Sequence, residues 1–463
     1  MQVEIVDQVD GRVVVSVPTT RRLQWSVAVL CALILTLPLL MGQRTPHTLT
    51  LSHLVMVAST ALVLLLAWAS GELRRPTRPW WVLGILVTAV VCLQVLPVPW
   101  LAQWFGPYPA AMWAQTDAQP AIQPQTWSPN VGASLRAWSV FVALLSIAWF
   151  VAHLPRPLRM WLWLAIVISA LFQAFYGLMA HAGGSTTVLG IWERNNVAFV
   201  HGSFSNRNVF SGYLALIWPL AIGVWFIRRV PMLHPLPTEI KIAGSLFCAG
   251  LIGTAMLGSA SRLGAAAGVF GIVLTIALWQ MRQRTNPHHR TWPAWLAAGS
   301  AMVAATWYGI TPLAERLVAT TGEEGRLVVW GQMLTEAPMA WWVHGVGLGG
   351  FEAAFKALQP GELSGKWYDY AHNDLLQWLF EMGLMGLVIL VLVGTTLWQR
   401  RRLDTESACL YAGLAAMAVV ALGDFSWHIP ATQVVIAAVL GALLKKPPRA
   451  DKHATHKAFE LDR

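Results

Sequence analysis

The sequence predicts an all-α polytopic membrane protein with about 12 transmembrane helices, and two observations carry this prediction. Of the 463 residues, 56% are hydrophobic and only 12% are charged, whereas soluble domains usually carry about 25% charged residues. Apolar runs also recur along the whole chain, and many reach the roughly 20 residues that a helix needs to cross a bilayer. The chain is therefore predicted to be embedded in a membrane.

Twelve apolar runs are predicted to span the membrane. The third and the last are the shortest, and the seventh and eighth are separated only by a turn at Ser261. In chain order the predicted helices cover residues 23–41, 48–70, 80–97, 134–154, 158–181, 208–227, 240–259, 262–281, 293–310, 374–398, 407–423 and 430–444.

Basic residues predict the orientation of these helices. Short loops rich in Lys and Arg, such as the one at Arg400-Arg401-Arg402, alternate along the chain with loops that contain few. Because cytoplasmic loops are enriched in basic residues, both termini are predicted to be cytoplasmic. The net charge of +10 is thus an orientation signal, and no nucleic-acid partner is predicted. The predicted division is a cytoplasmic segment 1–22, helices one to nine in 23–310, a long periplasmic loop 311–373, helices ten to twelve in 374–444, and a cytoplasmic tail 445–463.

No metal or cofactor is predicted. The four cysteines lie within or beside apolar runs without a CxxC pair, which disfavours a disulfide or a zinc site. The predicted outer face has no Asp-x-Asp pair, and His344, Asp369 and Asp374 lack the spacing of a ligand set.

Three arginines, Arg207, Arg262 and Arg326, lie at the predicted outer ends of helices. The positive-inside tendency disfavours arginine there, and a guanidinium binds phosphate oxygens in a two-pronged geometry. We predict that the three bind an anion, with the N-termini of the sixth and eighth predicted helices, near Asn208 and Arg262, adding positive dipole and with Asn206 and Asn208 as supporting residues. The alternative for each arginine is an interaction with lipid phosphate or with a nearby carboxylate.

His372 precedes the tenth predicted helix and is the candidate catalytic residue. A neutral imidazole beside anion-binding arginines suits a general base. Asn373 is a good helix N-cap, and Glu381 lies in an apolar helix where an ionisable group is costly. Glu381 is expected either to hold His372 or a loop in place, or to form a hydrogen bond between helices.

The glycines at 345, 347, 349 and 350 do not open a helix after a strand, so a nucleotide site is disfavoured. They are predicted to pack a turn closely on the membrane helices. Outer-loop tryptophans such as Trp330, Trp341 and Trp367 are expected either to stack on sugars or to anchor the chain at the membrane interface.

An ordered set of motifs resembles the O-antigen ligase and O-antigen polymerase superfamily of bacterial envelopes. The resemblance covers roughly residues 200–390 and includes Arg326-x3-Trp330, the His-x10-Gly spacing of His372 and Gly383, and a Ser-Arg turn at Ser261-Arg262. One departure matters: the family commonly has proline between the two asparagines of its Asn-x-Asn segment, where this chain has Arg207. The resemblance therefore implies no role for Arg207.

The resemblance implies a glycosyltransferase of the C-type fold in the bacterial inner membrane, with its active site facing the periplasm. Such enzymes move a glycan from undecaprenyl diphosphate to an acceptor, with inversion and without a metal. Arg262 and Arg326 would hold the diphosphate, and His372 would activate or orient the acceptor hydroxyl.

The acceptor stays open at this point. A ligase acting on lipid A core is favoured, an O-antigen or exopolysaccharide polymerase comes next, and a protein O-glycosyltransferase is less favoured. A lipid-linked glycan flippase would require polar residues through the membrane midplane, whereas the polar residues here collect on the outer face. A structural scaffold would leave the arginines and His372 without a role.

Overall fold

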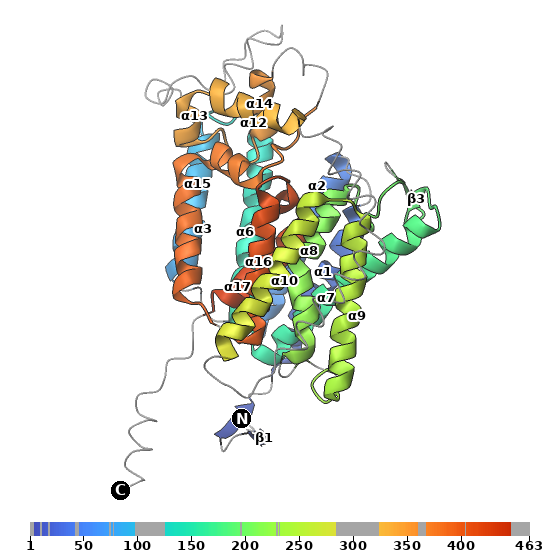
Figure 1. Cartoon of the computed structure of the whole chain (residues 1–463). Coiled ribbons are helices and arrows are strands. Elements are labelled where there is room, and N and C mark those ends of the chain that lie inside the picture. Colours follow the sequence, from blue (N-terminus) through green and yellow to red (C-terminus); the bar gives the residue numbers. More distant parts are fainter. Residues whose placement is uncertain are drawn as a thin grey trace.

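A computed structural model describes residues 4–9, 12–16, 19–41, 46–73, 76, 78–97, 126–194, 197–227, 230, 232–283, 324–359, 367–402 and 404–445. Figure 1 shows a bundle of long helices with a layer of short helices, α12 to α14, across one end. The hairpin that contains β1 (Glu4–Val9) lies at the other end.

Within the described residues, nine helices are long and apolar enough to cross a membrane, and α16 and α17 are shorter apolar helices. Eleven of the twelve predicted spans thus have a counterpart, and the remaining one, 293–310, lies outside the described residues. The helices are α1 (Arg21–Thr36, continued by the 3-10 helix Leu37–Met41), α2 (Pro46–Ala69), α3 (Arg78–Val95), α6 (Val131–His153), α7 (Arg156–Ala182), α8 (Arg207–Gly223, followed by the 3-10 helix Val224–Phe226), α9 (Thr238–Gly258), α10 (Arg262–Gln283), α15 (Asp374–Gln399), α16 (Thr405–Ala421) and α17 (Pro430–Leu443).

Polar side chains close the first turns of several helices. Asn130, Asn206, Asn373 and Asp404 accept hydrogen bonds from backbone amides at the starts of α6, α8, α15 and α16. The first amides of a helix have no partner within it, so these caps satisfy groups that would otherwise be costly near hydrocarbon. The caps fix where the candidate site residues next to them lie.

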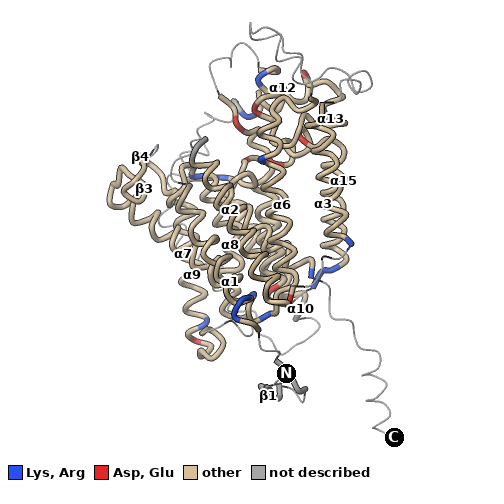
Figure 2. Tube along the Cα trace, turned by 180° about the vertical axis from the view of Figure 1, so that it is seen from behind, with Lys and Arg blue, Asp and Glu red and all other residues tan. Residues whose placement is uncertain are grey.

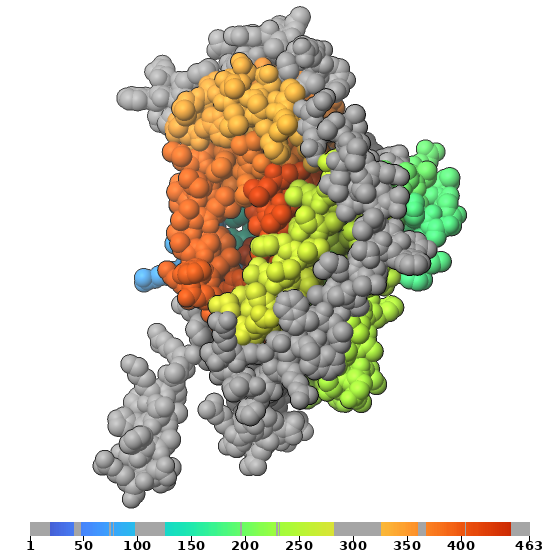
Figure 3. Space-filling model, in the orientation of Figure 1, coloured from blue at the N-terminus to red at the C-terminus, as the bar shows by residue number. Residues whose placement is uncertain are grey.

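Helix α8 forms the centre of the bundle, and every residue from Val209 to Gly223 is buried. It packs against α7, α9, α10 and α16. Helix α15 instead packs on α3 and on the short helices α13 and α14, and α3 in turn packs on α6. Figure 3 shows a hollow on the side of the molecule between α15 (orange) and α10 (yellow), with α6 (teal) behind it.

The layer across the end of the bundle has its own apolar core. It contains α12 (Glu324–Glu336), α13 (Met339–His344) and α14 (Phe351–Leu358), so the described part of the predicted loop 311–373 is largely helical. Trp341 and Phe351 are fully buried there, and both contact the ring of Phe380 from α15 edge-on. Burial lowers the pKa of His344 and so disfavours the charged form of its ring beside this apolar core.

Helix α15 is not continuous, contrary to the uninterrupted span predicted for 374–398. Gly383 has φ 60° and ψ −149°, which breaks the helix after its first two turns. A Cβ at Gly383 would lie 2.4 Å from the carbonyl oxygen of Val343. The break frees the carbonyls of Phe380 and Glu381 to accept from the amides of Val346 and Gly347, which joins α15 to the glycine-rich loop.

Two short hairpins complete the described fold. Near the N-terminus, β2 (Arg12–Ser16) pairs antiparallel with β1. In the polar loop between α7 and α8, β3 (Thr187–Val188) pairs with β4 (Trp192–Glu193).

Candidate functional site

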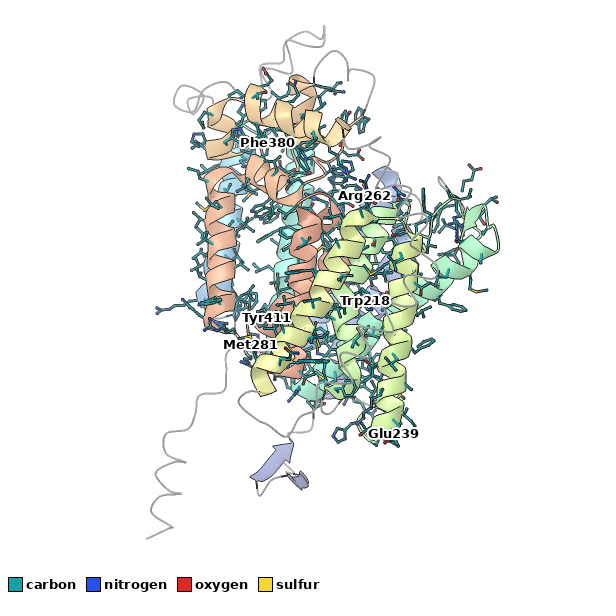
Figure 4. The ribbon with its side chains drawn as sticks, viewed as in Figure 1. Trp218, Glu239, Arg262, Met281, Phe380 and Tyr411 are labelled. Carbon is teal, nitrogen blue, oxygen red and sulfur yellow. The ribbon has the colours of Figure 1, made fainter. Side chains whose placement is uncertain are left out.

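The predicted site residues come from four segments: the first turns of α8 and α10, the start of α12, and the first part of α15 with the residues before it. The connection between α16 and α17, which includes a 3-10 helix at Ser426–His428, is hydrogen-bonded to the segments of α12 and α15. Figure 4 shows Arg262 at the upper end of α10 and Phe380 in the first part of α15. The sequence predicts that these segments lie on one side of the membrane, and the structure brings them to one end of the bundle.

His372 lies immediately before α15 in a left-handed backbone conformation, with φ 54°. Its Nδ1 is 3.7 Å from Oδ1 of Asp424, and its side chain is 31% exposed whereas that of Asp424 is 3% exposed. No hydrogen-bond partner of Nδ1 occurs among the described residues. The imidazole also has an apolar neighbour: it packs edge-on against the ring of Phe425, with the two ring centroids 4.8 Å apart. The imidazole is therefore oriented but not fully bonded.

A second histidine–carboxylate pair lies beside the first. His428 Nδ1 is 2.6 Å from Oδ1 of Asp374, and Oδ2 of Asp374 accepts from the backbone amide of Trp427 at 2.8 Å. Tyr370 stacks on Phe425 at 4.8 Å and also contacts the ring of His428 at 5.0 Å. The segment before α15 thus supplies His372 and Asp374, and the connection after α16 supplies Asp424 and His428. Each histidine faces the aspartate of the other segment.

Arg326, on the first turn of α12, reaches the same connection. Its Nη1 donates to the carbonyl oxygen of Gly423 at 2.7 Å, directly before Asp424. One turn further along α12, Trp330 Nε1 donates to the carbonyl oxygen of Ala371 at 2.7 Å. Helix α12 therefore fixes the guanidinium and the backbone that precedes His372.

Arg262 is the first residue of α10 and follows the tight turn from α9 that the sequence predicted. Ser261 Oγ accepts from the amide of Gly264 at 3.4 Å, which caps the helix start. The next residue, Leu263, lies against the connection after α16, since a Cβ at Gly423 would be 3.0 Å from its Cδ2. Arg262 and Arg326 thus belong to elements that contact the same residue, Gly423.

Arg207 has a different environment from the other two arginines. Its guanidinium carbon lies 4.1 Å from the ring centroid of Phe199, a cation–π contact. Its Nη1 is buried and has no hydrogen-bond partner among the described residues. Asn206 Oδ1 accepts from the amides of Asn208 and Val209, so Asn206 is a helix cap. The Asn208 amide is one of the groups it satisfies.

Glu381 holds the glycine-rich loop rather than His372. Its carboxylate accepts from the amide of Gly349 at 2.7 Å, from the amide of Phe351 at 3.4 Å, and from Gln377 Nε2 at 3.0 Å. Of the roles expected for Glu381, holding a loop is the one the geometry gives. Close packing of the loop also agrees with expectation, because a Cβ at Gly345 would be 2.2 Å from the carbonyl oxygen of Glu381.

The predicted tryptophans divide into distinct environments. Trp341 is fully buried, so it neither stacks on sugars nor anchors at a membrane surface. Trp330 uses its indole nitrogen on the backbone of Ala371. Trp367 is 69% exposed and is free to meet a ligand.

Sequence reasoning did not identify Asp424, Phe425 and His428. The signal was present: two ionisable residues lie within the short predicted outer turn between the runs 407–423 and 430–444. A carboxylate and an imidazole at the end of apolar helices are costly unless they are paired. Within the described residues, no group of three His, Cys, Asp or Glu side chains is arranged to hold a metal ion.

The long apolar helices and the polar cluster at one end define a multi-pass membrane protein with a candidate site where its helices begin and end. Residues 247–391 match a protein-family model described as O-antigen ligase. This confirms the predicted resemblance to the O-antigen ligase superfamily over that part of the chain. The matched range includes Arg262, Arg326, His372 and Glu381, whereas Arg207 and Asp424 lie outside it. Neither the search of curated proteins nor the search of solved structures gave a match.

Proposed function

We propose that this protein transfers a glycan from undecaprenyl diphosphate to an acceptor hydroxyl, with His372 as the general base and Arg262 and Arg326 as ligands of the diphosphate. The observation that carries the proposal is the approach of His372 to Asp424, in the connection that Arg326 also contacts. Arg262, Arg326 and His372 also lie within the residues that match the family model, 247–391. The site lies at the end of the bundle away from the β1 hairpin, which under the predicted orientation faces the periplasm.

The proposed step is a single displacement. The acceptor oxygen forms a bond to the anomeric carbon while the bond from that carbon to the diphosphate oxygen breaks. The electron pair leaves with the diphosphate, and the acceptor proton passes to Nε2 of His372, because Nδ1 faces Asp424. The configuration at the anomeric carbon is inverted. Donor and acceptor must be positioned together, and this contributes much of the rate in such reactions.

The leaving group sets the demand for positive charge. A diphosphate gains negative charge as the bond breaks, and fixed cations aimed at that charge lower the barrier. Two guanidinium groups supply this stabilisation in the proposed mechanism. The hydrogen bond from Arg326 to the carbonyl oxygen of Gly423 holds its guanidinium in place. Arg262 is the first residue of α10, so the positive end of that helix dipole lies beside it.

The lateral hollow between α15 and α10 supports a lipid-linked donor (Figure 3). The two helices that border it carry exposed apolar side chains, among them Leu387 and Val391 on α15 and Val273 on α10. A polyprenyl chain in the bilayer would reach the site sideways through this hollow while its diphosphate lies at the helix ends. A soluble nucleotide sugar would have no use for such an opening.

Transfer from a defined undecaprenyl-diphosphate glycan, measured with purified full-length protein, tests the proposal. Lipid A core, a second lipid-linked glycan and a serine-containing peptide are offered in parallel. Product on the lipid A core indicates a ligase, and product on the second lipid-linked glycan indicates a polymerase. Turnover of none of the three by folded protein would contradict the proposed function.

Reporter fusions test the orientation separately. A reporter inserted near residue 340 is expected to be periplasmic, and one inserted near residue 285 cytoplasmic. The reverse result would move the site to the cytoplasmic face and exclude a periplasmic transfer.

A further inference from the structure

The second charged cluster of the molecule lies at the opposite end, where α7, α15, α16 and α17 begin or end. Figure 2 shows Lys and Arg positions (blue) along the trace near the lower ends of the helices, on the side of β1. The cluster centres on Glu406, which is 5% exposed. Five cations and two carboxylates belong to it: Arg156, Arg159, Arg400, Arg402, Lys445, Asp404 and Glu406.

Both carboxylate oxygens of Glu406 interact with side chains of α7. Its Oε1 accepts from Arg159 Nε and from Trp163 Nε1, each at 2.9 Å. Its Oε2 lies 3.4 Å from Nε of Arg156. Asp404 is likewise used, since it caps α16 through the amide and hydroxyl of Ser407. The two carboxylates therefore do not neutralise the remaining positive charge.

Arg159 provides an observation that points to a ligand. Its side chain is only 8% exposed, yet its Nη1 is buried without a hydrogen-bond partner among the described residues. A buried donor without a partner is costly, and more so when it is charged. The Nη1 group of Arg159 can therefore still donate to an oxygen of a carboxylate or phosphate while Nε stays bonded to Glu406.

Lys445 is a second cation of the cluster, and its pKa reflects the excess of positive charge around it. Burial, followed by the charges of Arg159, Arg402 and Arg156, lowers the pKa of its amine to about 8, while Glu406 acts in the other direction. Its Nζ donates to the carbonyl oxygen of Leu154 at 3.0 Å. The N-termini of α7 and α16 and the C-termini of α15 and α17 meet in the same cluster, so the helix dipoles there oppose one another and the excess positive charge comes from the side chains.

We propose that this cluster binds a phosphate group at the membrane surface, with Arg159, Arg156 and Lys445 as its ligands. The phosphate is supplied either by the head group of an anionic phospholipid or by inorganic phosphate from solution. Basic pockets between the ends of transmembrane helices are suited to lipid head groups. Under the predicted orientation the cluster faces the cytoplasm, away from the proposed catalytic site.

The test measures thermal unfolding of purified full-length protein in detergent, at constant ionic strength. Short-chain phosphatidylglycerol, phosphatidylcholine of the same chain length and inorganic phosphate are titrated separately. We expect phosphatidylglycerol to bind at least about tenfold more tightly than phosphatidylcholine, as one charge-assisted interaction allows. Binding of phosphatidylglycerol alone identifies a lipid head group, and competition by inorganic phosphate identifies the phosphate group itself. An equal response to both lipids overturns the proposal.

The double variant Arg156→Gln, Lys445→Met tests the residues. It leaves Glu406 bonded to Arg159 and Trp163, so folding is expected to persist. Phosphatidylglycerol binding should weaken at least about tenfold. The matched control Arg21→Gln, Lys241→Met removes the same charge at the same end of the bundle, outside the cluster, and should change binding less than about twofold. An equal loss in both variants indicates diffuse charge and overturns the proposal.

A measurement on the unaltered protein removes the dependence on folding of the variants. Reductive methylation at about pH 8, mapped by mass spectrometry, should modify Lys445 faster than Lys241, because its lowered pKa leaves more neutral amine. Phosphatidylglycerol should slow the modification of Lys445 and not that of Lys241. Unchanged modification of Lys445 at a saturating lipid concentration overturns the proposal.

Discussion

The pairs His372–Asp424 and His428–Asp374 use the same two residue types in neighbouring positions, but they hold the imidazole differently. His428 lies 2.6 Å from an aspartate that is completely buried and that also accepts a backbone amide. His372 lies 3.7 Å from its aspartate, beyond hydrogen-bond range, with a left-handed backbone. The His428–Asp374 pair has the geometry of a structural crosslink, and His372 in the other pair has the geometry of a group that can still accept a proton.

This difference indicates that His372, rather than His428, can act as a general base. A hydrogen bond that is complete in the free protein leaves little to gain in the transition state, whereas catalytic hydrogen bonds in unliganded structures are often long and shorten when substrate binds. A non-glycine residue at positive φ is a position where the surrounding structure maintains strain, and such strain clusters at functional sites. Each of the following substitutions tests one half of the comparison.

Removing His372 should have the largest effect. His372→Asn is the sharpest variant, because asparagine tolerates the left-handed backbone better than alanine does. We expect transfer to fall by about 10²–10⁴-fold, the usual contribution of a general base. His372→Ala should lose as much activity with an added backbone cost. The measurement is transfer rate together with the thermal unfolding midpoint, and wild-type transfer by folded His372→Asn protein would exclude the catalytic assignment.

Asp424→Asn should have the next largest effect. The carboxylate orients the imidazole by facing Nδ1, so its loss should lower kcat about tenfold to a hundredfold, less than the loss of the base itself. KM for the donor should stay near the wild-type value, because Asp424 is not expected to bind the diphosphate. A change confined to KM would instead make Asp424 part of the donor site.

The contrast between the two pairs also marks the limit of inference from sequence. Apolar run length reports transmembrane helices directly, so the bounds of α7 and α15 lie within a few residues of those predicted. The pairing of residues 370–374 with 424–428 joins segments about fifty positions apart, and no local pattern specifies it. The sequence therefore indicated His372, and the tertiary structure was needed to find Asp424.

The break in α15 shows the same limit at a single residue. Gly383 was part of the motif that indicated the family, but glycine is tolerated within transmembrane helices, so its presence did not predict a break. Its positive φ follows from the close approach of Val343 and Gly345. The role of Glu381 was left open for the same reason, because its partner Gly349 belongs to a loop that no periodicity locates.

Asp374→Asn should reduce stability rather than catalysis. The carboxylate is fully buried and holds both His428 and the amide of Trp427. Replacing it leaves one buried group poorly satisfied, at a cost of about 1–3 kcal/mol in unfolding free energy. Transfer per folded molecule should remain within a few-fold of wild type. An intact unfolding midpoint combined with lost transfer would show that Asp374 acts in the reaction.

His428→Gln should have the smallest effect. A glutamine amide can still donate to Asp374, so the loss should be about one ordinary hydrogen bond, roughly 0.5–1.5 kcal/mol. The substitution also removes the contact between the rings of His428 and Tyr370, but Tyr370 still stacks on Phe425. Transfer measured beside His372→Asn gives the decisive comparison. If His428→Gln lost as much activity as His372→Asn, the tight pair would carry the proton and the assignment of the two histidines would be reversed.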